Sequence, residues 1–215
     1  MNHLPARFSP READPRRMTR RAQAKQITYD KVLQAAKRLF IARGYEASTI
    51  RGIAAEAGMS TGAVFANFTD KTDLFHAVLN ADLEAHLALV GGIVQHPGPI
   101  EAGLSELFSI GYQVQIEQLP LLQAAASLSW TEGLGGELGD RPPADKVLDM
   151  ATEMLERATI RKELSATADL RLAAEMLWDC YVANYRRAIF DNWNLDQLNA
   201  RLARQIELIL AGARL

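Results

Sequence analysis

The chain has 215 residues, of which 48% are hydrophobic and 23% are charged, enough apolar side chains for one sizeable core and a small additional module. This composition excludes a chain that is disordered throughout. The formal net charge of −2 hides an asymmetry, because residues 1–71 hold 13 Lys and Arg against 6 Asp and Glu, whereas residues 72–215 hold 11 against 20. The N-terminal third therefore suits a polyanionic partner, and the rest would repel one.

Cysteine usage and hydropathy indicate a cytoplasmic protein. Cys180 is the single cysteine, so no intrachain disulfide forms, and no Cys/His cluster suggests a structural metal. The longest uncharged apolar stretch, about 87–94, is too short to cross a bilayer, and no apolar run follows the N-terminal arginines. We therefore expect no export, no membrane insertion and no metal or other cofactor.

Residues 1–25 are polar and rich in Pro and Arg, which predicts a disordered basic arm. Two interpretations stay open at this point. The arm follows the DNA backbone or enters the minor groove, as other basic arms do, or it is a solvated extension that aids solubility.

A first helix is predicted over about 28–43. Thr28 and Asp30 suit its first turn, Gly44 ends it, and its apolar residues recur at helical spacing: Val32, Leu33, Ala36, Leu39 and Phe40.

Residues 44–74 predict two short helices joined by a tight turn, followed by the start of a further helix. Ile50, Ile53, Ala54 and Ala57 form one apolar stripe on a helix that Ser48 or Thr49 can cap. Gly58 then stops this helix, and Ser60 can cap the next one, which runs over about 61–67. This is the layout of a helix-turn-helix that reads DNA.

The same stretch resembles the N-terminal signature of TetR-family transcriptional regulators over about residues 27–75. The residues that carry the resemblance are Gly44-Tyr45, Thr49, Ile53-Ala54, Ala57-Gly58-Met59-Ser60, Gly62, Phe65, Phe68, Lys71 and Leu74. The chain departs from the pattern at Phe65, where a tyrosine is usual, and at Asn67, where a histidine or another aromatic residue is common. Phe65 can pack but cannot donate a hydroxyl to phosphate.

Few residues are expected to determine the DNA sequence that is bound. Arg51 can pair bidentately with guanine, or it contacts phosphate or stays solvated; Thr61 and Ala63 can touch base edges. The remaining predicted contacts go to the DNA backbone, and they are Tyr45, Thr49, Ser60, Phe65, Asn67 and Lys71. We therefore expect shape and phosphate contacts to supply much of the affinity.

Beyond this module, helical periodicity continues and no strand-like alternation appears, so the fold class is all-α. Thr69 or Asp70 caps a long helix that ends at Gly91-Gly92, and helices follow over about 100–118, 121–131, 144–163, 167–190 and 195–211. The segment 133–143 reads as a flexible loop. We predict an arm (1–25), a three-helix DNA-binding domain (26–72) and a larger helical domain for effector binding and dimerisation (73–215).

The resemblance implies a homodimer on a palindromic operator, and the last two helices offer apolar stripes for it. Leu177, Tyr181, Leu198, Leu202, Ile206 and Ile209 are the predicted interface residues, unless these stripes pack only within the subunit. Aromatic residues in the second domain suit a pocket for an apolar or aromatic small molecule, with Tyr112, Trp130 and Trp178 preferred.

Three function classes follow in order of preference. A repressor released from DNA by a small effector is favoured, and an architectural DNA-binding protein without an effector is second. A helical enzyme is remote, because the chain has no GxSxG, HExxH or phosphate-binding glycine motif and its four histidines are scattered.

Overall fold

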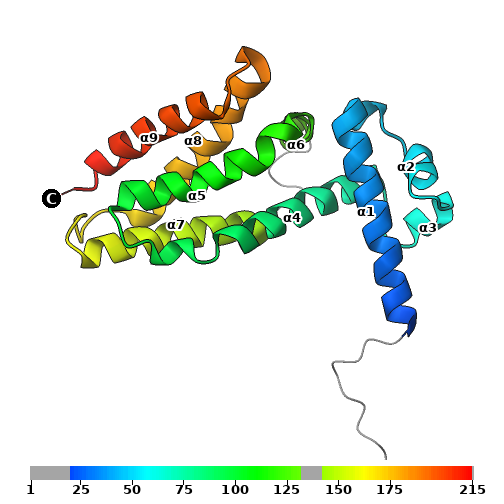
Figure 1. Cartoon of the computed structure of the whole chain (residues 1–215), viewed down its shortest axis with the longest axis horizontal. Coiled ribbons are helices and arrows are strands. Elements are labelled where there is room, and N and C mark those ends of the chain that lie inside the picture. Colours follow the sequence, from blue (N-terminus) through cyan, green and yellow to red (C-terminus); the bar gives the residue numbers. More distant parts are fainter. Residues whose placement is uncertain (1–19, 132–141, 215) are drawn as a thin grey trace, which may run out of the picture.

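The computed structural model describes residues 20–131 and 142–214, and every regular element in these two ranges is a helix, which confirms the all-α prediction. Figure 1 shows a small head of three helices joined to a longer helical body. The α-helices are α1 (Arg20–Ala47), α2 (Ile50–Glu56), α3 (Thr61–Phe65), α4 (Lys71–Val90), α5 (Ile100–Gln115), α6 (Leu119–Thr131), α7 (Pro142–Ile160), α8 (Leu170–Asp191) and α9 (Leu195–Ala211). Short 3₁₀ turns lie at Ile93–Gln95 and Ile116–Gln118.

Helix α1 begins earlier than the sequence predicted. It starts at Arg20 rather than near residue 28, so residues 20–25 are helical and the prediction of disorder is wrong for them. These residues are good helix formers that need no apolar face, and those whose side chains are described are exposed. Residues 1–19 of the predicted arm lie outside the described residues. The predicted stop holds, since Gly44 breaks the helical backbone at φ 78°.

The head has its own apolar core, to which helices α1 to α4 all contribute. Its buried members are Val32, Leu33, Ala35, Ala36, Leu39, Phe40, Tyr45, Ile53, Ala54, Val64, Phe68, Leu74, Phe75, Val78 and Leu121. The predicted boundary at residues 72 and 73 falls in the first turn of α4, and the next turns of α4 complete the head. The head therefore continues directly into the helix that leads to the body.

Helix α4 links the two parts and is capped by Asp70, whose side chain accepts from Asp73 N. The segment Lys71–Gln95 is long and apolar enough to cross a membrane, by length and composition alone. The sequence did not predict such a segment, because the uncharged apolar run at 87–94 is too short to cross a bilayer. Ion pairs occupy its middle: Lys37 of α1 donates to Asp82 at 2.6 Å, and Lys146 of α7 donates to Glu84 at 2.7 Å. These two ion pairs join α4 to α1 and to α7.

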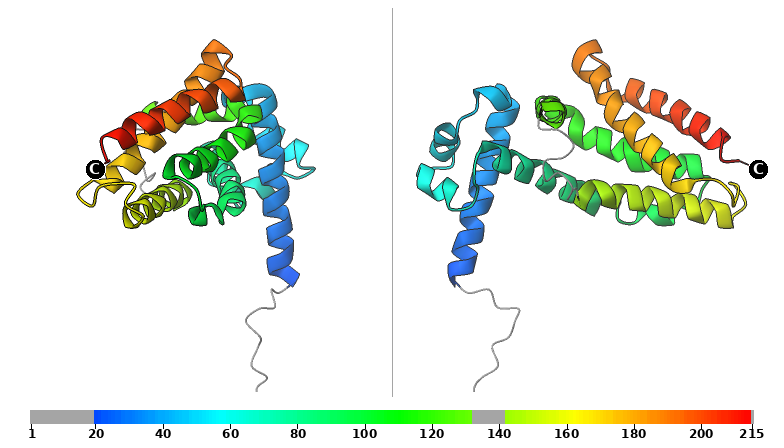
Figure 2. Two further views of the ribbon diagram at one scale, coloured as in Figure 1. Left: turned by 60° about the vertical axis from the view of Figure 1, so that its left-hand side comes forward. Right: turned by 180° about the vertical axis from the view of Figure 1, so that it is seen from behind.

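The body consists mainly of α4, α5, α7, α8 and α9, packed around a second apolar core (Figure 2). The predicted helices 100–118, 144–163, 167–190 and 195–211 are confirmed with small shifts at their ends. Asn194 begins α9 with a capping box, because Asn194 and Gln197 bond each other's backbone N–H. The predicted loop 133–143 lies almost entirely outside the described residues.

Helix α6 belongs to both cores. Leu121 is 2% exposed in the head core, and Ala124, Ala125 and Leu128 pack against the same core at helical spacing. Leu119 and Leu122 instead pack against the body core. The gap left between the predicted helices 100–118 and 121–131 is not present, because Pro120 lies in the first turn of α6, where a missing N–H costs nothing. Figure 1 shows α6 end-on beside α1.

A polar cluster lies inside the body, where α4, α5 and α8 meet. Tyr181 Oη and Tyr185 Oη are 2.7 Å apart, and both donate to Gln115 Oε1 at 3.2 and 2.6 Å. Burial raises the pKa of both phenols well above the usual value. His86 of α4 is 3% exposed, and neither ring nitrogen has a hydrogen-bond partner among the described residues. Burial lowers the pKa of its imidazole, which favours the neutral form.

Replacing Leu121 by alanine should destabilise the protein by about 2 to 5 kcal/mol, because it opens a cavity between α6 and the head. Chemical denaturation measures this loss, and Gln123→Ala, an exposed position on the same helix, is the matched control. A Leu121→Ala effect no larger than that of Gln123→Ala would show that α6 does not stabilise the head.

Acidification should destabilise the folded state through His86. Because the pKa of His86 is lower when folded than its usual value of 6.5, the unfolded chain binds more protons once the pH falls below that value. The full free energy of unfolding is therefore retained above about pH 6.5, and it declines as the pH falls further. Melting temperatures across this window should fall for the wild type and less for His86→Phe. Parallel curves for the two proteins would contradict this assignment.

Candidate nucleic-acid interface

The turn between α2 and α3 is built as the sequence predicted. Thr49 caps α2 by accepting from Gly52 N at 3.1 Å, and Ser60 caps α3 by accepting from Ala63 N at 3.3 Å. Gly58 has φ 68°, which lets the chain leave α2, and Met59 N donates back to Ala54 O at 2.8 Å. These bonds fix the angle between the two helices. Ser48, the other proposed cap, is buried and donates to Gly44 O instead.

Helix α3 has one buried side and one bare side. Val64 is fully buried in the head core, while Thr61, Gly62, Phe65 and Ala66 are exposed. Phe65 is 56% exposed, so this side of α3 presents an apolar ring next to small side chains.

The other predicted residues of α3 are less accessible. Ala63 and Asn67 are half-buried, and Asn67 Nδ2 donates to Ala63 O at 3.0 Å. Gly62 and Ala66 were not predicted as contacts, yet they lie opposite Val64 on the bare side. The helical spacing of both residues from Val64 is the signal that could have found them.

Tyr45 and Lys71 are tied to each other in the head. The rings of Tyr45, Phe40 and Phe75 contact one another, and the Tyr45 hydroxyl is 2.9 Å from Thr72 Oγ1. Lys71 Nζ lies 4.0 Å from the centre of the Tyr45 ring and donates to Tyr45 O at 3.0 Å. Both side chains therefore fix the start of α4 against the end of α1, a role that the sequence did not predict.

Arg51 is the exposed cation closest in sequence to the turn. Its guanidinium has no partner among the described residues, in contrast to Arg38, which donates to Glu56 at 3.0 Å. Thr49 and Ser60 are exposed at the starts of α2 and α3. The bare side of α3, the two helix starts and Arg51 are the features that this surface offers to a nucleic acid.

Two of the three predicted ligand-binding residues, Tyr112 and Trp178, lie beside the same ring, that of Tyr181. Tyr112 is fully buried; its hydroxyl donates to Tyr181 O at 3.2 Å and accepts from Asn184 Nδ2 at 3.0 Å. Trp178 is half-buried, and the rings of Tyr112 and Trp178 both contact that of Tyr181, at 4.7 and 5.5 Å. Trp130 lies near the end of α6, outside the described side chains.

The predicted dimer residues point inward, so that prediction needs correction. Leu177, Leu198 and Ile206 are fully buried in the subunit's own core, Leu202 and Tyr181 are nearly so, and Ile209 is half-buried. An amphipathic stripe cannot show whether it faces its own subunit or a second one, and here the strongest stripe faces inward.

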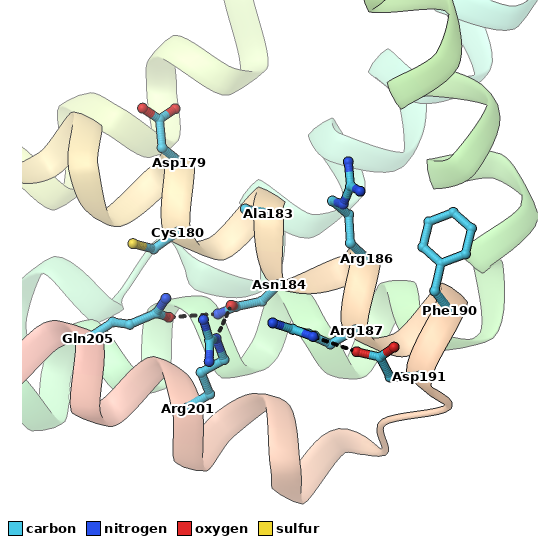
Figure 3. A pocket seen from close by; sticks show the side chains of 10 residues that line it. All are labelled: Asp179, Cys180, Ala183, Asn184, Arg186, Arg187, Phe190, Asp191, Arg201 and Gln205. Atoms are coloured by element: carbon cyan, nitrogen blue, oxygen red, sulfur yellow. Dashed lines mark hydrogen bonds and ion pairs between the residues drawn. The ribbon is translucent and has the colours of Figure 1, made fainter.

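The outer side of α8 and α9 carries a weaker stripe that the sequence analysis missed. Leu172, Met176, Ala183 and Phe190 repeat at four- and seven-residue steps on α8 and are exposed. An open groove of about 580 Å³ runs along this side (Figure 3). Within it, Arg201 Nε donates to Asn184 Oδ1 at 2.9 Å, and Asn184 Nδ2 donates to Gln205 Oε1 at 2.8 Å.

Comparisons with known proteins point to the same helix-turn-helix. Residues 32–78 match the family described as bacterial regulatory proteins, tetR family. The chain is 26% identical over 165 residues to the HTH-type transcriptional repressor BepR of Brucella suis, covering 70% of this chain and 75% of BepR. It is 36% identical over 66 residues to the repressor AcnR of Corynebacterium diphtheriae, covering 30% of this chain and 35% of AcnR.

A solved structure shows the same fold along nearly the whole chain. A Mesorhizobium loti structure assigned to the same family superposes with a TM-score of 0.69 at 22% identity, covering 92% of this chain and all of that one. Together with the match at residues 32–78, which includes α2, the turn and α3, these likenesses agree with the bare reading surface of the head. The chain therefore carries, at residues 32–78, the helix-turn-helix domain of the TetR family of transcriptional regulators.

Proposed function

We propose that the chain is a repressor that binds a palindromic operator as a homodimer and leaves it when a small apolar or aromatic effector binds in the body. The observation that carries the DNA-binding part is the two-sided packing of α3. Val64 anchors it in the head, while its other side is bare and carries the small residues Thr61, Gly62 and Ala66 beside Phe65. Small side chains let the helix approach a major groove closely.

The charge distribution supports the same part of the proposal. The basic excess lies in residues 1–71, which include the whole helix-turn-helix, and the acidic excess lies in the remainder. Neutralised phosphates release counterions, so affinity should fall steeply as salt rises. The acidic body keeps the duplex on the head.

We assign base reading to Arg51, with Thr61 and Ala63 touching base edges, and backbone contacts to Thr49, Ser60, Phe65 and Asn67. Tyr45 and Lys71 contribute mainly as positioning residues, because the Tyr45 hydroxyl and the Lys71 amino group already have partners within the head.

We place the dimer interface on the outer side of α8 and α9, with a second copy of the chain as the occupant. Exposed apolar residues on this side belong to both helices, and Leu208 of α9 is 75% exposed. Both acidic and basic side chains line the groove on this side, among them Asp179 and Arg186. A two-fold axis would set each against its opposite in the other copy. One head covers only half of a palindromic site, so pairing is required for full affinity.

The effector is proposed to bind among the aromatic residues of the body, beside Tyr112 and Trp178. To release DNA it must bind two conformations of the protein unequally. Helix α4 transmits the difference, because it begins in the head core and continues along the body core. Trp130 belongs to the same proposal, as a ligand contact from α6. No enzymatic step is part of the proposal.

Arg51→Ala should weaken binding to a duplex selected with the wild-type protein by about 5- to 150-fold, which corresponds to the loss of one bidentate base contact. Fluorescence anisotropy measures the affinity, and Arg51→Lys is the matched variant, which keeps the charge but lacks the rigid planar fork of the guanidinium. If Arg51→Lys binds as tightly as wild type, Arg51 contacts phosphate and does not read a base.

Leu208→Glu should convert the protein to monomers at micromolar concentration, because it places a charge in the proposed apolar contact. Size-exclusion chromatography with light scattering measures the mass. The matched control is Leu89→Glu on α4, where an exposed leucine lies away from α8 and α9. A wild-type monomer, or a Leu208→Glu dimer, would contradict the assigned interface.

A further inference from the structure

His86 is the most costly polar side chain in the body core. It is 3% exposed, and both Nδ1 and Nε2 lack a hydrogen-bond partner among the described residues. Each buried unpaired polar atom costs on the order of 1 to 3 kcal/mol. An apolar residue at this position would avoid that cost, so the fold alone gives no reason for an imidazole here.

Three groups from different helices converge at this point. A methyl group added to Gly111 of α5 would lie 2.7 Å from His86 Cε1 and 2.3 Å from Tyr181 Oη of α8. Around them lie aromatic rings, since Tyr181 contacts Phe108, Tyr112 and Trp178 at 5.1, 4.7 and 5.5 Å. The imidazole of His86, which can donate and accept hydrogen bonds, thus lies beside a group of aromatic rings.

The surroundings of His86 are electrically neutral. On α4 itself, Asp82 is paired with Lys37 and Glu84 with Lys146 of α7, and the polar groups from α5 and α8 are Gln115, Tyr112, Tyr181 and Tyr185. Burial alone lowers the pKa of the imidazole, with no contribution from a neighbouring charge. A charged ligand group would therefore meet no counterion at this position.

We propose that His86 is the hydrogen-bonding anchor of the effector site and that the effector is a neutral aromatic compound carrying a hydroxyl group. This inference rests on the proposed function of the body as the effector domain. A hydroxyl both donates and accepts, so it pairs with His86 whichever ring nitrogen carries the proton. A carboxylate only accepts and would need a cation, and an ammonium only donates and would need a carboxylate.

Occupation of the site should move α4. The contact of His86 with Gly111 and Tyr181 leaves no space even for one methyl group, so a ligand must separate α4 from α5. Helix α4 starts at Lys71, directly after the reading helix, and its first turns belong to the head core. The effector therefore binds the conformation in which α4 and α5 are separated and does not bind the closely packed one. Release from DNA requires such a difference in affinity between the two conformations.

Calorimetric titration with naphthol, naphthalene and naphthoate tests the anchor. The wild-type homodimer should bind naphthol about tenfold more tightly than naphthalene, the difference expected for one buried hydrogen bond, and should bind naphthoate more weakly than naphthol. In His86→Phe the preference for naphthol over naphthalene should disappear, whereas His86→Gln, which retains a donor and an acceptor, should restore part of it.

Equal naphthol-to-naphthalene ratios in wild type and His86→Phe would overturn the proposal, as would a preference for naphthoate or no binding of any of the three compounds. Anisotropy with the selected duplex separates this failure from failure of the proposed function. If a different compound releases the wild type and His86→Phe equally from DNA, the proposed function as an effector-responsive regulator is supported. The proposal that His86 anchors the effector is then contradicted. If His86→Phe fails to fold, loss of the naphthol preference in His86→Leu decides the question, and its persistence there overturns the anchor.

Discussion

The packing of α4 and α6 against α1 is the constraint on which the rest of the structure depends. Without it the head would lose four of the fifteen buried residues of its apolar core, three from α4 and one from α6. Apolar burial is non-directional, but the part-buried Lys37–Asp82 bond fixes the register of α1 against α4. The head is therefore held to the body at two helices, so a shift of α4 or α6 in the body changes where α3 points.

In the proposed mechanism, this arrangement lets polar groups in the body core affect DNA binding at a distance. The cluster of Tyr181, Tyr185 and Gln115 is well satisfied by its own hydrogen bonds, whereas His86 beside it is not. A satisfied network favours one packing of the body, and an unsatisfied group lowers the cost of leaving that packing. In the proposed mechanism, the unpaired His86 is a local weakness in the packing of the helix that continues into the head, and a ligand that pairs with it gains energy only when that helix moves.

Sequence reasoning succeeded where local chemistry determines structure. The caps at Thr49 and Ser60, the left-handed glycine at position 58 and the apolar stripes of the head all follow from residue types at fixed spacing, and the structure confirms them. It failed at the start of α1, because Arg, Ala and Gln form a helix without any apolar face to announce it. It also misassigned Leu198, Leu202 and Ile206, since periodicity shows that a stripe is buried but not which molecule buries it.

The candidate site was predictable in outline and less so in detail. Phe65 and Arg51 are exposed, as a contact with DNA would require, but the engagement of Tyr45 with Lys71 depends on a contact across 26 residues that no local pattern contains. In the sequence, His86 stands out only as a histidine four residues after Asp82. In the structure that carboxylate turns to Lys37 and leaves the imidazole unpaired, which is a tertiary result.

The most direct test of the account is a footprint of the protein on a duplex selected from a random pool. Two rigidly held heads in one dimer predict two protected half-sites related by symmetry, one helical turn or a multiple of it apart, with affinity that falls as salt rises and exceeds that for a scrambled duplex. A single protected segment, or equal affinity for the selected duplex, the scrambled duplex and heparin, would contradict it.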